Sequence, residues 1–258
     1  MQRYFIQPGQ FEGETARIEG EDAHHLARVM RARPGDVVIV SDGAGREAKL
    51  QLQSVGTDVV TGVVVELLAA TQEPKAEVTV AQSLPKGDKM ETVIQKCTEI
   101  GAFRFVPFLS ERTIVRYDER KEKNRLERWK KIAKEAAEQA HRNRIPRVEA
   151  PSSWKELIGT IPQYDAAFLC YERERNRQLR NELRIALGSW TGTKEVRPWR
   201  AILIVGPEGG FTDQEAAEAE QAGARPVGLG ARILRAETAA MVGLTCILYE
   251  TGEMVGST

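Results

Sequence analysis

The sequence predicts a two-domain protein of mixed α/β class, with a small antiparallel β unit followed by a larger domain built on a parallel sheet. Up to about residue 70, short apolar runs alternate with period two between glycine turns. Beyond a polar, proline-containing segment at 70–77, nearly continuous apolar runs alternate with helical patterns, as in parallel sheets covered on both faces. We therefore expect domains at 1–72 and 73–258.

In the first domain we expect one helix and three strands. The helix covers 21–31, with Asp22 as its N-cap. The strands cover 36–42, 47–55 and 58–68, separated by turns rich in glycine. Period-two alternation of apolar residues indicates that one face of these strands is buried.

In the second domain the pattern alternates between strands and helices. The expected strands are 77–84, 103–108, 165–171 and 200–205, and the expected helices are 89–101, 122–142, 212–223 and 236–250. The last helix is almost entirely apolar, so we expect it to be buried on most sides. The segment 173–198 is expected to form a surface helix and a loop.

Composition restricts the class of protein. The 258 residues are 41% hydrophobic, and no run approaches the roughly 18 apolar residues of a membrane span. The first residues lack the pattern of a signal peptide, which predicts a cytoplasmic protein. Three cysteines, Cys97, Cys170 and Cys246, lie far apart in apolar surroundings, and the three histidines show no ligand spacing. We expect neither disulfides nor a metal cofactor.

The charge is uneven although the net charge is zero. Residues 112–147 carry 13 Lys and Arg against 6 Asp and Glu. Such a basic region attracts phosphate, but a solvated helix surface explains it equally well. Within it, Glu135 and Arg142 share a face of the expected helix 122–142, and Arg144 with Pro146 completes a cationic corner.

The segment Gly206-Pro207-Glu208-Gly209-Gly210 follows the apolar strand 200–205. Ligands of parallel sheets bind beyond the carboxyl ends of the strands, and glycines there let the backbone approach a ligand. A tight connection to the next helix, which Thr212 and Glu215 begin as a capping box, would explain the glycines as well. Neither a dinucleotide fingerprint nor a P-loop is present, so we expect a ligand held through something other than phosphate.

A second glycine-containing loop, Gly228-Leu229-Gly230, follows a short apolar run and leads into the helix 236–250. Between them, Ile233 and Leu234 are bracketed by Arg232 and Arg235, which face either substrate or solvent. If the two preceding strands are neighbours, the two loops converge on one crevice. An apolar slot walled by backbone polar groups suits an adenosine-like ligand.

Together these segments resemble a known family. The matching stretches are GPEGGF, LGARILRAETAA, KMETVIQKCTEIG, SERT, EAAEQAHRNRIP, HHLARVMRARPGD and SDGAG, which span essentially the whole chain. They resemble the bacterial ribosomal RNA small-subunit methyltransferase E family, within the SPOUT class of knotted methyltransferases.

The resemblance implies a PUA-like β-barrel that binds RNA at 1–72 and a SPOUT methyltransferase domain with a deep trefoil knot at 73–258. It also implies a homodimer that methylates N3 of one uridine in small-subunit ribosomal RNA, with S-adenosylmethionine as cofactor. The expected cofactor-binding residues are Val205, Gly206, Pro207, Glu208, Gly209, Gly210, Leu229, Gly230, Ile233, Leu234, Arg235, Thr238 and Ala239.

Methylation of uridine N3 requires loss of a proton from a weakly acidic imide, and hence a general base or a cation that stabilises the anion. Arg142 or Arg235 is the expected cation, and Glu208 or Glu135 the expected proton acceptor. The residues expected to contact RNA are Arg3, His24, Arg28, Arg31, Arg33, Arg112, Arg142 and Arg144. Of these, His24, Arg28 and Arg31 are spaced to share one helix face.

Three alternatives stay open. A SPOUT enzyme that acts on a ribose 2′-oxygen or on transfer RNA would share the cofactor loops. An RNA-binding protein without catalytic activity would need no adenosine slot. A nicotinamide-dependent Rossmann enzyme is disfavoured because its fingerprint is missing.

Overall fold

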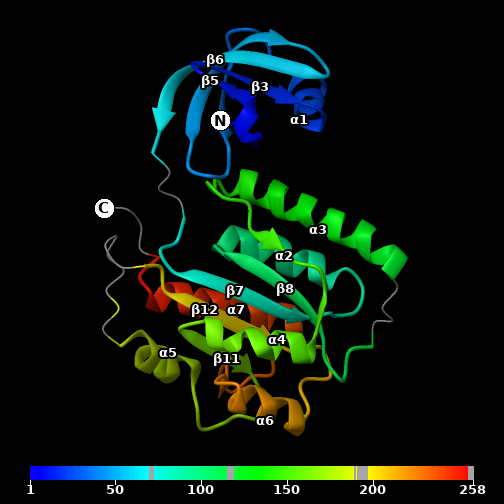
Figure 1. Ribbon diagram of the computed structural model, residues 1–258, viewed down its shortest axis with the longest axis vertical. Helices are drawn as coiled ribbons and strands as arrows, with labels where there is room; N and C mark the ends of the chain where they lie inside the picture. Colours follow the sequence, from blue (N-terminus) through cyan, green and yellow to red (C-terminus); the bar gives the residue numbers. More distant parts are fainter. Residues whose placement is uncertain (70–72, 115–118, 189, 191–196, 255–258) are drawn as a thin grey trace. The chain divides into compact units, whose positions relative to one another are not determined.

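The computed structural model describes residues 1–69, 73–114, 119–188, 190 and 197–254. The chain forms two compact units, coloured along the sequence in Figure 1. Unit 1 comprises residues 1–73 and 137–145, and unit 2 comprises 74–136 and 146–258. This division differs from the expected domains because residues 137–145, at the end of a long helix, pack with the N-terminal segment.

Unit 1 is built on one six-stranded sheet of order β1-β4-β5-β6-β3-β2. Its strands are β1 (Arg3–Phe5), β2 (Phe11–Glu12), β3 (Thr15–Glu19), β4 (Val37–Ser41), β5 (Glu47–Val55) and β6 (Val59–Leu68). Only β1 and β4 pair in parallel, and the register between β5 and β6 shifts twice. Such bulges increase strand twist, and the sheet curls around fully buried Ile18, Leu50 and Val60.

The expected helix 21–31 is shorter and of mixed type. An α-helical turn, α1 (Glu21–His24), continues as a π-helical turn, η2 (His25–Val29), in which the Met30 N–H donates to the His25 carbonyl at 3.0 Å. Arg31 follows the helix with a φ of 51°. The prediction that His24, Arg28 and Arg31 share one helix face is therefore wrong, because Arg31 lies beyond the helix.

Unit 2 contains a sheet in which all pairs are parallel, of order β10-β8-β7-β12-β11-β13, with β9 paired to β8. Its strands are β7 (Glu77–Ser83), β8 (Arg104–Leu109), β9 (Arg147–Val148), β10 (Ser152–Ser153), β11 (Ala166–Cys170), β12 (Arg200–Val205) and β13 (Arg225–Val227). The predicted α/β class with a parallel sheet is confirmed. The non-sequential strand order agrees with the expected knot.

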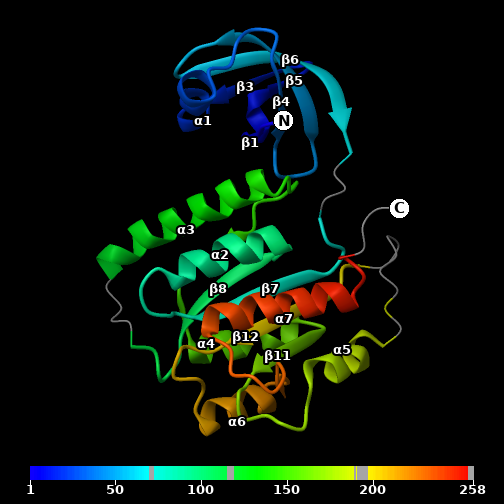
Figure 2. The ribbon, with the colours of Figure 1, turned by 180° about the vertical axis from the view of Figure 1, so that it is seen from behind.

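Helices cover both faces of this sheet (Figures 1 and 2). On one face lie α4 (Trp154–Thr160) and α6 (Asp213–Gln221), packed through buried Phe108, Ile204 and Phe211. On the other lie α2 (Lys89–Ile100) and α7 (Ala236–Glu250). The remaining helices are η1 (Pro8–Gln10), α3 (Glu119–Gln139), η3 (Ile161–Gln163) and α5 (Leu179–Leu187). The helix expected at 122–142 therefore ends at Gln139, before Arg142.

Helix α7 is less buried than its sequence predicts. Ala240, Leu244 and Ile247 face the sheet and are fully buried, but Cys246 is exposed and Tyr249 is 69% exposed. Burial on most sides is therefore confirmed only in part, because Cys246 and Tyr249 are exposed while the other positions of α7 are buried or half-buried. Among the described residues, no helix combines the length and apolar character needed to cross a membrane.

Candidate active site

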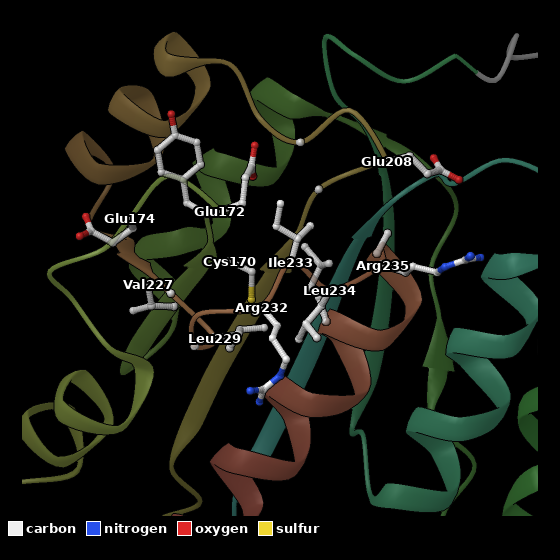
Figure 3. A pocket seen from close by; sticks show the side chains of 18 of the residues that line it. Cys170, Glu172, Glu174, Glu208, Val227, Leu229, Arg232, Ile233, Leu234 and Arg235 are labelled. Atoms are coloured by element: carbon white, nitrogen blue, oxygen red, sulfur yellow. The ribbon is translucent and has the colours of Figure 1, made fainter.

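A pocket of about 720 Å³ lies in unit 2, at the carboxyl ends of β11, β12 and β13 (Figure 3). Three loops line it, one after each strand, together with Lys89 of α2 and Ala239 of α7. The carboxyl ends of parallel strands share one edge of a sheet, which is why segments so distant in sequence meet there. The volume suits a ligand of nucleoside size.

The loop after β12 is held in place by its surroundings. Gly210 adopts a φ of 66°, in the left-handed region that favours glycine, and its N–H donates to the Pro207 carbonyl at 2.9 Å. Arg112 Nη1 donates to the Gly209 carbonyl at 2.8 Å, and Gln82 Nε2 donates to the Gly206 carbonyl at 3.2 Å. The loop is therefore preformed, with its backbone facing the pocket.

The loop after β13 is held against the loop after β11. The Gly228 N–H donates to the Arg177 carbonyl at 2.9 Å, and a side chain at Gly228 would place its Cβ 2.7 Å from the Glu174 carbonyl oxygen. Only glycine permits this approach of two backbones. The two glycine loops do converge as expected, although β11 lies between β12 and β13, so the strands themselves are not neighbours.

Charged groups surround the mouth of the pocket. Glu208 accepts hydrogen bonds from Lys89 Nζ at 2.6 Å and from the Lys86 N–H at 3.2 Å. Partial burial raises the pKa of Glu208, but the hydrogen bonds from Lys89 and from backbone N–H groups outweigh it and hold the pKa below its ordinary value. In Figure 3, Glu208 and Arg235 lie on one side of the pocket, and Glu172 and Glu174 on the other.

Most of the predicted cofactor residues line this pocket. Those that do are Val205, Gly206, Pro207, Glu208, Gly209, Gly210, Leu229, Gly230, Ile233, Leu234, Arg235 and Ala239. Thr238 does not. Lys89 and the loop after β11, from Tyr171 to Gln178, also line the pocket and were not among the expected residues. The signal for that loop was present, since its strand was recognised and ends at the same edge of the sheet.

Arg3 and Arg142 are buried in unit 1, with side chains 4% exposed. Arg3 donates to Glu47 at 2.7 Å and 2.8 Å and to the Arg142 carbonyl at 2.8 Å. Arg142 donates to Glu73 at 2.5 Å. Because carboxylates already neutralise both guanidinium groups away from solvent, this geometry speaks against the expected RNA contacts of Arg3 and Arg142 and against a catalytic role of Arg142.

The other expected residues lie at the surface. In unit 1, His24, Arg28, Arg31, Arg33 and Arg144 are exposed. In unit 2, Arg112 is exposed and bound to the loop after β12, whereas Glu135 is exposed on α3 and does not line the pocket. Within the ranges that the structure describes, no group of three His, Cys, Asp or Glu side chains is arranged to hold a metal ion.

Comparison with known families gives two matches in the same chain. Residues 71–248 match the model of an RNA methyltransferase domain, and residues 18–65 match that of an RNA methyltransferase PUA domain. The first covers most of unit 2, including every residue that lines the pocket, and the second falls within unit 1.

Relatives match over most of this chain. The ribosomal RNA small subunit methyltransferase E of Bacillus subtilis is 39% identical over 97% of both chains, and that of Synechocystis is 36% identical over 95% of this chain and 76% of its own. Among solved structures, that methyltransferase from Neisseria gonorrhoeae bound to S-adenosylmethionine is 27% identical with a TM-score of 0.84, covering 99% of this chain and 100% of its own. A Legionella pneumophila protein in complex with the same cofactor has a TM-score of 0.82 at 27% identity, over 96% and 97% of the two chains.

Proposed function

The chain belongs to the ribosomal RNA small subunit methyltransferase E family, and we propose that it methylates N3 of one uridine in small-subunit ribosomal RNA, with S-adenosylmethionine as the methyl donor. The observation that carries this proposal is the pocket at the ends of β11, β12 and β13. A similar structure of the family was solved with that cofactor bound.

The residues of the pocket fit such a cofactor. Apolar Val205, Leu229 and Leu234 supply contact surface, while the glycine loops offer backbone N–H and C=O groups to an adenosine and an amino acid moiety. The sulfonium of the bound donor supplies an activated methyl group. The protein must then orient the acceptor nitrogen, exclude water and remove the proton from N3.

Two residues of the pocket are placed for this work. Glu208 stands at the rim of the loop after β12, where it would accept the N3 proton, and Arg235 stands at the start of α7, where it would face the uracil oxygens. Ile233 is 90% exposed at the lip, and bound substrate would cover it. Glu135 and Arg142 have no such position, so we leave them out of the mechanism.

Unit 1 would bind the RNA. Arg28, Arg31 and Arg33 are exposed together on and after the π-helical turn, beside exposed Val29 and Met30. Phosphate contacts release counterions, so neutralising Arg28 and Arg31 should reduce the salt dependence of RNA binding by about one unit of slope each.

A homodimer would explain the exposed stripe of α7. Exposed Cys246 and Tyr249 and half-buried Val242 recur at helical spacing, and a second copy of the chain would bury them. Tyr249→Glu should give a monomer in sedimentation at a concentration at which the natural chain is a dimer. If the natural chain and Tyr249→Glu sediment with the same mass, the proposed dimer contact through α7 is wrong. We also propose that the protein acts in the cytoplasm, where its ribosomal substrate would be.

Primer extension on ribosomal RNA tests the reaction. A methyl group on N3 blocks Watson-Crick pairing and stops the polymerase, so cells that lack the protein should lose one stop in small-subunit ribosomal RNA. Returning the natural gene should restore this stop, and a gene for the Gly210→Ala variant should give a weaker stop. Loss of a ribose 2′-O-methyl group, or of a methyl group in transfer RNA, would overturn the proposal.

A further inference from the structure

Lys89 is the first residue of α2 and lines the pocket beside the loop after β12. Its Nζ lies 2.6 Å from Glu208 Oε1 although 119 positions separate the two residues. Both side chains are 32% exposed, so the pair is held together and is still accessible to a substrate. Lys89 begins the stretch KMETVIQKCTEIG that resembles the family, but the sequence analysis gave it no role in the site.

While it is paired with Lys89, Glu208 is a poor acceptor for the N3 proton. The hydrogen bond from Lys89 stabilises the carboxylate, which opposes protonation of that same carboxylate. Uridine N3 is a weak acid, so transfer of its proton to a stabilised carboxylate is uphill. The transfer becomes easier if Lys89 stabilises the uracil anion as well as it stabilised the Glu208 carboxylate.

We propose that Lys89 is a catalytic residue whose ammonium group turns from Glu208 to a uracil carbonyl oxygen as N3 loses its proton. This inference rests on the proposed methylation of uridine N3. The N3–H bond breaks and its proton joins the Glu208 carboxylate. The N3 electron pair forms the bond to the methyl carbon, and the electrons of the methyl–sulfur bond stay on sulfur, which becomes neutral.

The total charge of the pair and the uracil does not change during proton transfer, because the negative charge moves from Glu208 to the uracil. Before proton transfer, Lys89 faces the Glu208 carboxylate, and afterwards it faces the uracil anion, while Glu208 is neutral. A cation that is already in place needs little reorganisation, which is the condition for strong electrostatic stabilisation. Among the described residues that line the pocket, Lys89 is the cation that a direct ion pair ties to Glu208, whereas Arg232 and Arg235 are exposed at the start of α7.

The test is single-turnover methylation of small-subunit ribosomal RNA at saturating donor. Lys89→Met should lower the rate about 10²- to 10³-fold, as loss of one preorganised donor does, and Lys89→Arg should retain more activity. Lys96→Met is the matched control, because Lys96 lies two turns along the same face of α2 and pairs with Glu99. Its rate should stay within about threefold of the natural rate.

Two further measurements separate catalysis from support of the loop. Calorimetry with S-adenosylhomocysteine should give Lys89→Met an affinity within about threefold of the natural one, because the pocket walls stay intact. The N3 of 5-fluorouridine is more acidic, so less stabilisation of the anion is needed. Replacing uridine by 5-fluorouridine in the RNA should therefore raise the methylation rate of Lys89→Met at least about tenfold more than it raises the rate of the natural enzyme. A structural defect would not respond to the acidity of the substrate.

The inference is overturned if Lys89→Met methylates RNA within threefold of the natural rate. It is also overturned if the loss of rate is matched by an equal loss of affinity for S-adenosylhomocysteine, or if 5-fluorouridine does not raise the rate of the variant. Mass spectrometry of the digested product separates this from failure of the proposed function. A methyl group found elsewhere than on uridine N3 with the natural enzyme removes the proposed function itself. N3-methyluridine from the natural enzyme, together with a fully active Lys89→Met, removes only the role of Lys89.

Discussion

The buried ion pair of unit 1 gives the largest stability effect that we expect from a single substitution. Glu47 is 4% exposed and accepts from both Arg3 Nη atoms and from Asn143 Nδ2. Glu47→Ala leaves the Arg3 guanidinium buried without its carboxylate, a change that costs about 3 to 5 kcal/mol in the free energy of unfolding. Since 1.36 kcal/mol is tenfold in an equilibrium, amide protection in unit 1 should fall about 10²- to 10⁴-fold.

Hydrogen exchange measured by mass spectrometry checks this prediction. The loss of protection should include residues 137–145, because Asn143 and the Arg142 carbonyl belong to the same network, while β7 and β12 keep theirs. The double variant Arg3→Met/Glu47→Leu should recover most of the loss, because it removes both charges instead of one. The reasoning fails if protection at 137–145 changes less than tenfold, or if β12 loses as much as unit 1 does.

Three further outcomes are expected in unit 2. Gly243→Ala places a Cβ 2.7 Å from Leu203 Cδ2 and should cost about 1 to 3 kcal/mol, seen as a lower Tm by tryptophan fluorescence; an unchanged Tm would contradict this packing. Gly210→Ala puts a side chain on a residue with positive φ, which costs about 1 to 2 kcal/mol, and should weaken cofactor binding about 5- to 30-fold by calorimetry. Gly188→Ala, which also has a positive φ but lies outside the pocket, should leave cofactor binding unchanged. The Arg197 hydrogen bond lowers the pKa of Asp165, so Asp165→Asn should destabilise the protein at pH 7. The difference in stability should shrink as the pH falls below about 4 and through the lowered pKa, and a difference that does not shrink on acidification would refute this assignment.

The sequence was sufficient for much of the fold and for part of the site. Period-two runs identified β5 at its observed bounds, and the apolar runs identified β12 and α7 at theirs. Thr212 and Glu215 form the expected capping box at the start of α6. The glycine loops at 206–210 and 228–230 were predicted to bind a ligand, and both line the pocket.

The role or burial of a residue was not predicted where it depends on partners that are distant in the sequence. Arg142 followed a basic pattern typical of an RNA contact, yet it is buried against Glu73. Helix α7 was expected to be covered on most sides, but its composition does not say whether this chain or another one covers it. Lys89 was passed over because an isolated lysine at a helix start carries no local signal.

By itself the sequence determined which segments are strands and helices and which loops lie at strand ends, because backbone preference and side-chain periodicity act over a few neighbouring residues. Only the tertiary structure decided that three such loops form one pocket, that Lys89 meets Glu208 there, and that Arg3 and Glu47 pair inside unit 1. The physical reason is that charge pairing and burial depend on distance in space, and the chain brings those residues together only when the parallel sheet and the curled sheet have formed.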